Sequence, residues 1–156
     1  MRKSVIDAPP IPPASREGQW LDLPTIASVQ VTSEDPAFPI ESAFSQDRNE
    51  GWRAAKPGEQ IIRILFDHPV SLRRIQLRFL ETEQARTQEF ALLYLTLNGG
   101  PREIVRQQWN FSPDGSTSEA ESYRVELADV STLELTIKPD IGGHTAIASL
   151  ASLLLA

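Results

Sequence analysis

The chain has 156 residues, a formal net charge of −6 and no cysteine. Its length suits one domain that buries enough surface to fold without a metal ion or a disulfide, and the missing cysteines exclude thiolate and zinc–thiolate chemistry. The negative charge disfavours a nucleic-acid partner, because sequence-independent binding relies on cations that displace counterions from phosphates.

The sequence carries no sign of a membrane span or a secretory signal. No run approaches the ~18 apolar residues that a membrane span needs. The start, "MRKSVIDAPPIPP", is basic but lacks an apolar segment. We therefore expect a protein of the cytoplasm, or of a virion or secretion assembly.

Residues 1–24 are predicted to form a proline-rich leader ahead of a domain at residues 25–156. The stretch "APPIPPAS", Ala8–Ser15, favours an extended polyproline conformation and is unsuited to a sheet interior. Such a leader is either a free tail or a segment that docks on a partner subunit, and the sequence leaves both alternatives open.

After the leader, short alternating stretches separated by turn residues predict strands throughout. Inward positions such as Ile75, Leu77 and Phe79 alternate with polar ones, and Asn98–Gly100 is typical of a hairpin turn. The expected strands are residues 26–33, 60–66, 73–80, 89–97, 102–109, 122–127, 132–139 and 146–155. This pattern predicts an all-β fold, an antiparallel jelly-roll β-sandwich.

Four pieces, in this order, resemble the discoidin family, also called the coagulation factor five/eight C-type or galactose-binding-domain-like family. They are "ESAFSQDRNEGWRAAKPGEQIIRILF", "SLRRIQLRF", "RTQEFALLYLTLNGGPREIV" and "LTIKPDIGGHTAIASLASLLL". The resemblance covers roughly residues 26–156. It implies a non-catalytic module that recognises glycans, lipid head groups or proteins.

The same resemblance implies that the loops gather at two opposite ends, with ligands bound at the end that has the longer loops. The long-loop end is expected to collect residues 44–59, 81–88, 108–121 and 139–145. The opposite end is expected to collect residues 68–71, 98–102 and 129–132, including His68.

Family members with a structural calcium ion use an aspartate loop and a glutamate near the closing strand. Asp47 matches the loop position, but Arg48 replaces the usual glycine, and Ala151-Ser152 stands where the family has Ala-Glu. A divalent cation needs several oxygen ligands, usually with a carboxylate among them. We therefore expect no cofactor, with Asp47 as a weak candidate for calcium.

The candidate ligand-binding residues are Arg53, Arg86, Trp109, Asn110 and His144. Arginines supply planar donors for sugar hydroxyls, and an aromatic ring supplies a face for the C–H surface of the sugar. Several of these residues also have a structural alternative.

The structural alternatives concern both aromatic and charged side chains. Trp52 either caps the core, as the resemblance implies, or forms a ligand platform, and Trp109 and Phe111 either stack on a sugar or face the core. Arg86 either binds ligand or only pairs with Glu83 or Glu89. His144, after two glycines, is either a sugar ligand or an ordinary surface residue.

The residues do not favour an enzyme. The chain lacks G-x-S-x-G, H-E-x-x-H and phosphate-loop motifs. Glu119 and Glu121 are expected in a polar loop, Ser112–Glu121, without an apolar pocket that raises the pKa of one carboxyl. The leading hypothesis is therefore a glycan-binding module, and the alternative is a structural or adaptor subunit that uses the fold for protein contact.

Overall fold

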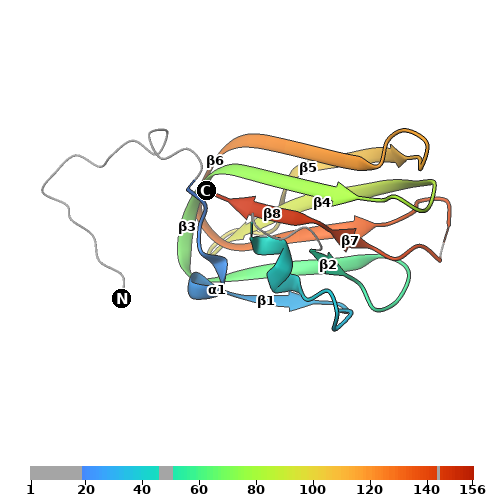
Figure 1. The fold of residues 1–156 in the computed structure, drawn as a ribbon. Helices are drawn as coiled ribbons and strands as arrows, with labels where there is room; N and C mark the ends of the chain where they lie inside the picture. The colour runs from blue at the N-terminus through green and yellow to red at the C-terminus, as the bar shows by residue number, and fades with distance from the viewer. Residues whose placement is uncertain (1–18, 46–50, 144) are drawn as a thin grey trace, which may run out of the picture.

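A computed structural model describes residues 19–45, 51–143 and 145–156. Figure 1 shows an elongated molecule made almost entirely of antiparallel strands. The elements in chain order are α1 Leu23–Ile26, β1 Ala27–Val31, the 3-10 helix η2 Ile40–Phe44, β2 Trp52–Arg53, β3 Gln60–Leu80, β4 Arg86–Thr96, β5 Arg102–Phe111, β6 Ser118–Lys138, β7 Ser149–Leu150 and β8 Ser152–Leu155. Within the described ranges, no helix is long and apolar enough to cross a membrane.

The strands form two layers, because β3 and β6 each bend and continue from one layer into the other. The large layer contains β1, the first half of β3, the second half of β6, β4 and β5. The small layer contains the first half of β6, the second half of β3 and β8. A short β2–β7 ladder lies beside them. The predicted antiparallel jelly-roll sandwich is confirmed.

The bends replace two of the predicted loops. Residues 68–71 and 129–132 lie inside β3 and β6, not between separate strands. Register shifts between Leu65 and Arg74 mark the bend in β3, yet Val70 still pairs with Val130. Irregularities of this kind turn a strand while its ladder continues, so a proline and a histidine at this position do not end β3.

Alternation along the strands builds the core between the layers. Ile62 and Ile64 face inward from the large layer, and Ile75 and Leu77 face inward from the small layer, all with almost no exposure. The ring of Phe79 in the small layer lies 5.3 Å from that of Phe90 in the large layer, centroid to centroid. Each such side chain contributes about 1.5–3 kcal/mol through burial.

The described part of the predicted leader, residues 19–24, packs on the sandwich. The amide of Leu21 donates to the carbonyl of Leu155 at 2.7 Å, and Leu23 is buried in the core. The guanidinium carbon of Arg74 lies 4.3 Å from the centroid of the Trp20 ring. Residues 1–18 lie outside the described residues.

The connections gather at two opposite ends of the sandwich, as the resemblance implies. Figure 1 shows the β3–β4, β5–β6 and β6–β7 connections together at one end, called here the long-loop end. The β4–β5 hairpin and the bends of β3 and β6 lie at the opposite end, near α1. The rigid strands therefore bring segments that are far apart in the sequence to one end.

Candidate functional site: a groove beside Arg53

The short strand β2 separates a buried tryptophan from an exposed arginine. Trp52 has 0% exposure, and its indole N–H donates to the carbonyl of Ser33 at 3.2 Å. The role of Trp52 as a core cap is thus confirmed. Because side chains alternate along a strand, the next residue, Arg53, points outward.

Backbone pairing on both sides fixes the position of Arg53. Its amide donates to Phe38 O at 3.2 Å, its carbonyl accepts from the Asp35 amide at 2.9 Å, and Ser149 is its register partner on β7. The guanidinium carbon lies 4.7 Å from the centroid of the Phe38 ring. This cation–π contact leaves an exposed, planar donor group in a defined orientation.

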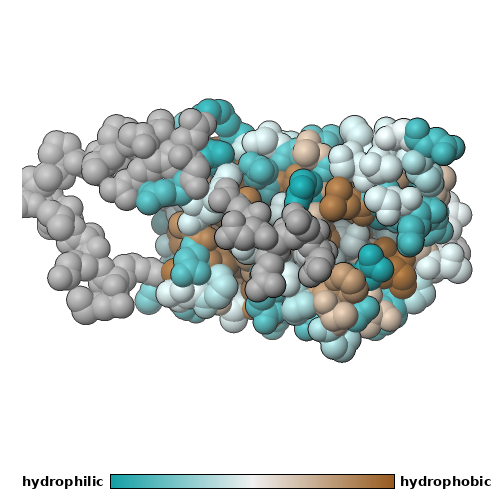
Figure 2. Space-filling view, viewed as in Figure 1, coloured by the Kyte–Doolittle hydropathy of each residue, from teal (hydrophilic) through white to brown (hydrophobic). Residues whose placement is uncertain are grey.

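Arg53 borders a groove of about 510 Å³ at the long-loop end. Apolar surface comes from Phe38, Leu80 and Ile147, and polar groups come from the 81–84 segment and from Ser149. The lining residues are Phe38, Arg53, Leu80, Glu81, Thr82, Glu83, Gln84, Thr145, Ile147, Ser149 and Ala151. On the uncovered part of the face in Figure 2, hydrophobic side chains likewise form small patches among hydrophilic ones.

The 81–84 wall of the groove is held by the Glu81 carboxylate. Glu81 Oε2 accepts from the amides of Glu83 at 3.0 Å and Gln84 at 3.2 Å, and Oε1 accepts from Arg86 Nε at 2.7 Å. Burial alone would raise the pKa of Glu81. The hydrogen bonds and the charge of Arg86 outweigh burial and hold this pKa below its usual value.

Arg86 lies behind this wall and does not line the groove. Its side chain is fully buried, it donates to Pro139 O at 2.7 Å and to Gln88 Oε1 at 3.1 Å, and its guanidinium lies over the Phe111 ring. The sequence suggested Glu83 or Glu89 as the ion-pair partner of Arg86, but the partner is Glu81. Arg86 therefore joins the wall to the interior.

Trp109 and Asn110 are also separate from the groove lining. Trp109 is partly buried against the core, and Phe111 is buried in it. Asn110 is exposed on β5 and accepts from the Thr87 hydroxyl at 2.7 Å. His144 and Asp47 lie outside the described residues. In those described, no three or more His, Cys, Asp and Glu side chains form a group that could hold a metal ion.

Sequence patterns did not predict Phe38, Ile147 and Ser149 as neighbours of Arg53. The only local signal was the placement of Phe38 between prolines in "DPAFPI". Their proximity depends on the pairing of β2 with β7, which a local pattern cannot predict.

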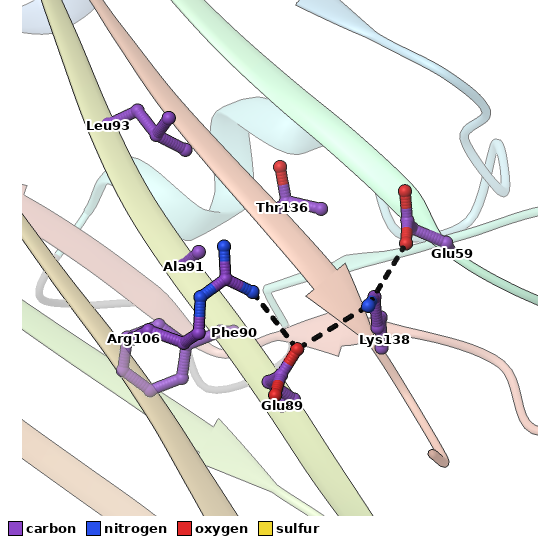
Figure 3. Close-up of a pocket in the computed structure, with 8 residues that line it drawn as sticks. All are labelled: Glu59, Glu89, Phe90, Ala91, Leu93, Arg106, Thr136 and Lys138. Carbon is purple, nitrogen blue, oxygen red and sulfur yellow. Dashed lines mark hydrogen bonds and ion pairs between the residues drawn. The ribbon is translucent and has the colours of Figure 1, made fainter. Parts of the chain in front are cut away.

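A second, smaller hollow of about 190 Å³ lies on the outer face of the large layer. Figure 3 shows Glu89 between Arg106 and Lys138, with N–O distances of 3.1 Å and 3.5 Å, over a floor that includes Ala91 and Thr136. A hydrogen bond from Gln108 and both cations lower the pKa of Glu89. Since these charged side chains pair with one another, the hollow offers a ligand fewer unpaired polar groups than the Arg53 groove does.

The prediction that Glu119 and Glu121 lie in a polar loop is wrong. Strand β6 already begins at Ser118, and both side chains point inward from it. Glu119 has 1% exposure. Burial first, and then the neighbouring carboxyl of Glu121, raises the pKa of Glu119 to about 8. The two carboxyls do not lie in an apolar pocket. They accept hydrogen bonds from polar side chains, Gln88 on β4 and Gln107 on β5.

Comparison with solved structures identifies the architecture. The family 32 carbohydrate-binding module of Clostridium perfringens NanJ, solved in complex with galactose, matches with a TM-score of 0.61 and 16% identity, over 83% of this chain and 92% of that one. The fold is discoidin-like. A scan of family models and a search of curated proteins found no match.

Two further structures share the discoidin-like fold. The module CpGH89CBM32-4 of Clostridium perfringens, in complex with GlcNAc-α-1,4-galactose, matches with a TM-score of 0.61 and 14% identity, over 89% of this chain and 95% of that one. A pectin-binding carbohydrate-binding module matches with a TM-score of 0.56 and 16% identity, over 83% and 89% of the two chains. The fold predicted from the resemblance is confirmed.

Proposed function

We propose that this chain is a non-catalytic binding module whose groove beside Arg53 recognises a carbohydrate. The groove carries the proposal, because it joins an exposed planar donor to apolar surface from Phe38 and Ile147. Sugar hydroxyls accept from guanidinium groups, and the C–H face of a sugar ring packs on apolar side chains. Its volume falls within the roughly 300–1,000 Å³ of small-ligand pockets.

The sugar complexes of structures with the same fold support the choice of the first ligand to test. Galactose and a galactose-containing disaccharide are bound by two of the modules that this chain resembles. Arg53 acts as the direct contact, and Arg86 acts through Glu81 on the groove wall. Trp109 and Asn110 contact only a ligand that extends beyond the groove. Roles for His144 in sugar binding and for Asp47 in calcium binding stay predictions.

A glycan array, followed by titration with galactose, tests this function. We expect a dissociation constant on the order of 1 mM or weaker, because a shallow polar groove gains little over desolvation. Arg53→Ala should weaken binding at least about tenfold, the effect of one charge-assisted contact worth about 1.4 kcal/mol. Arg102→Ala, the same change at the opposite end, should leave it unchanged. No response from any glycan with folded protein would refute the proposal.

The alternative function, an adaptor subunit that contacts another protein, rests on the way the leader approaches the sandwich. Residues 19–23 are anchored to β3 and β8 at the end away from the groove. A partner that contacts residues 19–23 would therefore leave the groove accessible. Loss of assembly without loss of glycan binding, after deletion of residues 1–18, would support both roles together. An adaptor of this kind suits the expected cytoplasmic, virion or secretion-assembly location.

A further inference from the structure

A continuous series of hydrogen bonds leads from the groove wall into the interior. It begins at Glu81, which holds the 81–84 wall and accepts from Arg86. Arg86 Nη1 donates to Gln88 Oε1 at 3.1 Å, and Gln88 Nε2 donates to Glu119 Oε1 at 3.4 Å. Arg86, Gln88 and Glu119 are all buried. The Gln88 amide therefore connects the cation behind the wall with a carboxyl of the opposite layer.

The inner end of this series is a pair of neighbouring carboxyls on β6. Glu121 accepts a short hydrogen bond from Gln107 Nε2, and Gln107 Oε1 accepts from the Tyr123 hydroxyl. Both carboxyls accept from a side-chain amide, Glu119 from Gln88 and Glu121 from Gln107. Glu119 is the more buried of the two, with 1% exposure, and burial disfavours the charged form, so the proton is placed on Glu119. The pKa of about 8 at Glu119 agrees with this assignment.

Few charged groups face Glu119 among the described residues. On its own strand these are Glu121 and Tyr123, and from β4 it is Arg86, behind which stands Glu81. Phe79, its register partner on β3, carries no charge, and the β5 side chain that bonds to Glu121 is the neutral Gln107. Arg86 is therefore the cation that responds when Glu119 loses its proton.

We propose that the proton held by Glu119 keeps the 81–84 wall of the groove in shape, and that its loss releases the wall. Deprotonation places a second negative charge in a buried setting, next to Glu121. Arg86 Nη2 is buried without a hydrogen-bond partner among the described residues, so it has an unused donor to offer. Movement of Arg86 toward Glu119 weakens its bond to Glu81.

The affected bonds are those that shape the binding surface. Once the guanidinium shifts, Glu81 retains, within the described part of the chain, only the amides of Glu83 and Gln84 as partners, and the wall becomes mobile. An effect of Glu119 deprotonation on sugar affinity rests on the proposed function. In that case the protein binds sugar more weakly above the pH at which Glu119 loses half of its proton. The coupling between Glu119 protonation and the shape of the 81–84 wall does not depend on a ligand.

The test is carbon-detected carbonyl–nitrogen NMR of the ligand-free full chain between pH 6 and 9.5, where signals do not depend on exchangeable amide protons. We expect the signals of Glu81, Glu83 and Gln84 to shift together with a midpoint near pH 8. In Glu119→Gln this transition should disappear. In Glu103→Gln, a carboxyl of the exposed Arg106 pair, it should remain.

Two outcomes would overturn the proposal. One is a wall that does not titrate between pH 6 and 9.5, and the other is an identical transition in Glu119→Gln. Where Glu119→Gln fails to fold, Glu121→Gln serves instead. It removes the neighbouring charge that raises the pKa of Glu119, so the midpoint should move to lower pH, and an unchanged midpoint would count against the coupling.

A galactose titration at pH 6.5 and pH 9 separates this inference from the proposed function. Wild-type protein should bind several-fold more weakly at pH 9, and Glu119→Gln should bind equally at both values. If galactose fails to bind at either pH, the choice of ligand is wrong, while the ligand-free NMR result still decides whether the carboxyl pair controls the wall.

Discussion

Arg86 Nε donates to Glu81 Oε1 at 2.7 Å, and this ion pair joins the groove wall to the hydrophobic interior. The Arg86 side chain is fully buried, whereas that of Glu81 has 16% exposure. A pair of this kind fixes the geometry of a binding surface from behind. In the proposed function, Arg86 thus acts by holding the wall from the interior and not by contact with a ligand.

Replacement of Arg86 by methionine should destabilise the protein by about 3 kcal/mol, because it removes the hydrogen bonds to Glu81, Gln88 and Pro139 O and leaves buried acceptors unsatisfied. The matched control is Arg63→Met. Arg63 pairs with Glu134 at 2.8 Å but is 42% exposed, so its loss should cost less than about 1 kcal/mol. Urea denaturation measures both. Equal losses would mean that the Arg86 pair contributes no more than a surface pair.

Gly51 is the glycine whose replacement should matter most to the groove. Its φ is +66°, and an added Cβ would lie 2.1 Å from Leu150 O. Gly51→Ala should therefore cost more than about 2 kcal/mol, since the left-handed conformation alone costs roughly 1–2 kcal/mol. Gly58→Ala is the control, because φ is +94° there but an added Cβ meets nothing within 4 Å. Thermal unfolding that ranks the two variants the other way would contradict this account.

Alternation of apolar residues was enough to predict the strands, since the inward faces of β3 and β6 are set by positions such as Ile75 and Leu133. It was not enough to predict that β3 runs through residues 67–72. Asp67, His68 and Pro69 have the composition of a loop, but bulges keep this stretch in the ladder with β6.

Polar residues were the harder part of the site. Glu119 has the sequence surroundings of a mobile loop, and its burial depends on Gln88, 31 positions earlier in the chain. Arg86 and Arg53 look alike in the sequence, but one faces the interior and the other faces solvent. Local composition does not show whether a charged side chain faces the interior or the solvent.

The boundary of the folded domain should lie before Gln19, not at residue 25. Leu23→Ala should cost about 2–5 kcal/mol in urea unfolding, because Leu23 is 2% exposed in the core. Leu97→Ala, at a side chain with 73% exposure, serves as the control and should change stability by less than about 0.5 kcal/mol. A Leu23 variant as stable as the Leu97 variant would restore the boundary at residue 25.

Protein stability should depend on pH in opposite directions at the two carboxyls of the network. The pKa of Glu119 is raised to about 8 in the folded chain, so the folded state binds this proton more tightly than the unfolded state does. Its contribution is fully present below about pH 4.5 and is lost as the pH rises toward 8, with a slope of at most about 1.4 kcal/mol per pH unit. The pKa of Glu81 is lowered, so its contribution is present above about pH 4.5 and is lost in more acidic solution.

Urea denaturation across pH 3 to 9 should accordingly place maximum stability near pH 5, with a decline on both sides. Glu119→Gln should flatten the alkaline decline and leave the acidic one, because the amide cannot ionise while Glu81 is unchanged. Glu103→Gln should retain both limbs. If the Glu119 variant keeps the alkaline decline in full, the buried carboxyl is not its source, and the proton assigned to Glu119 must reside elsewhere.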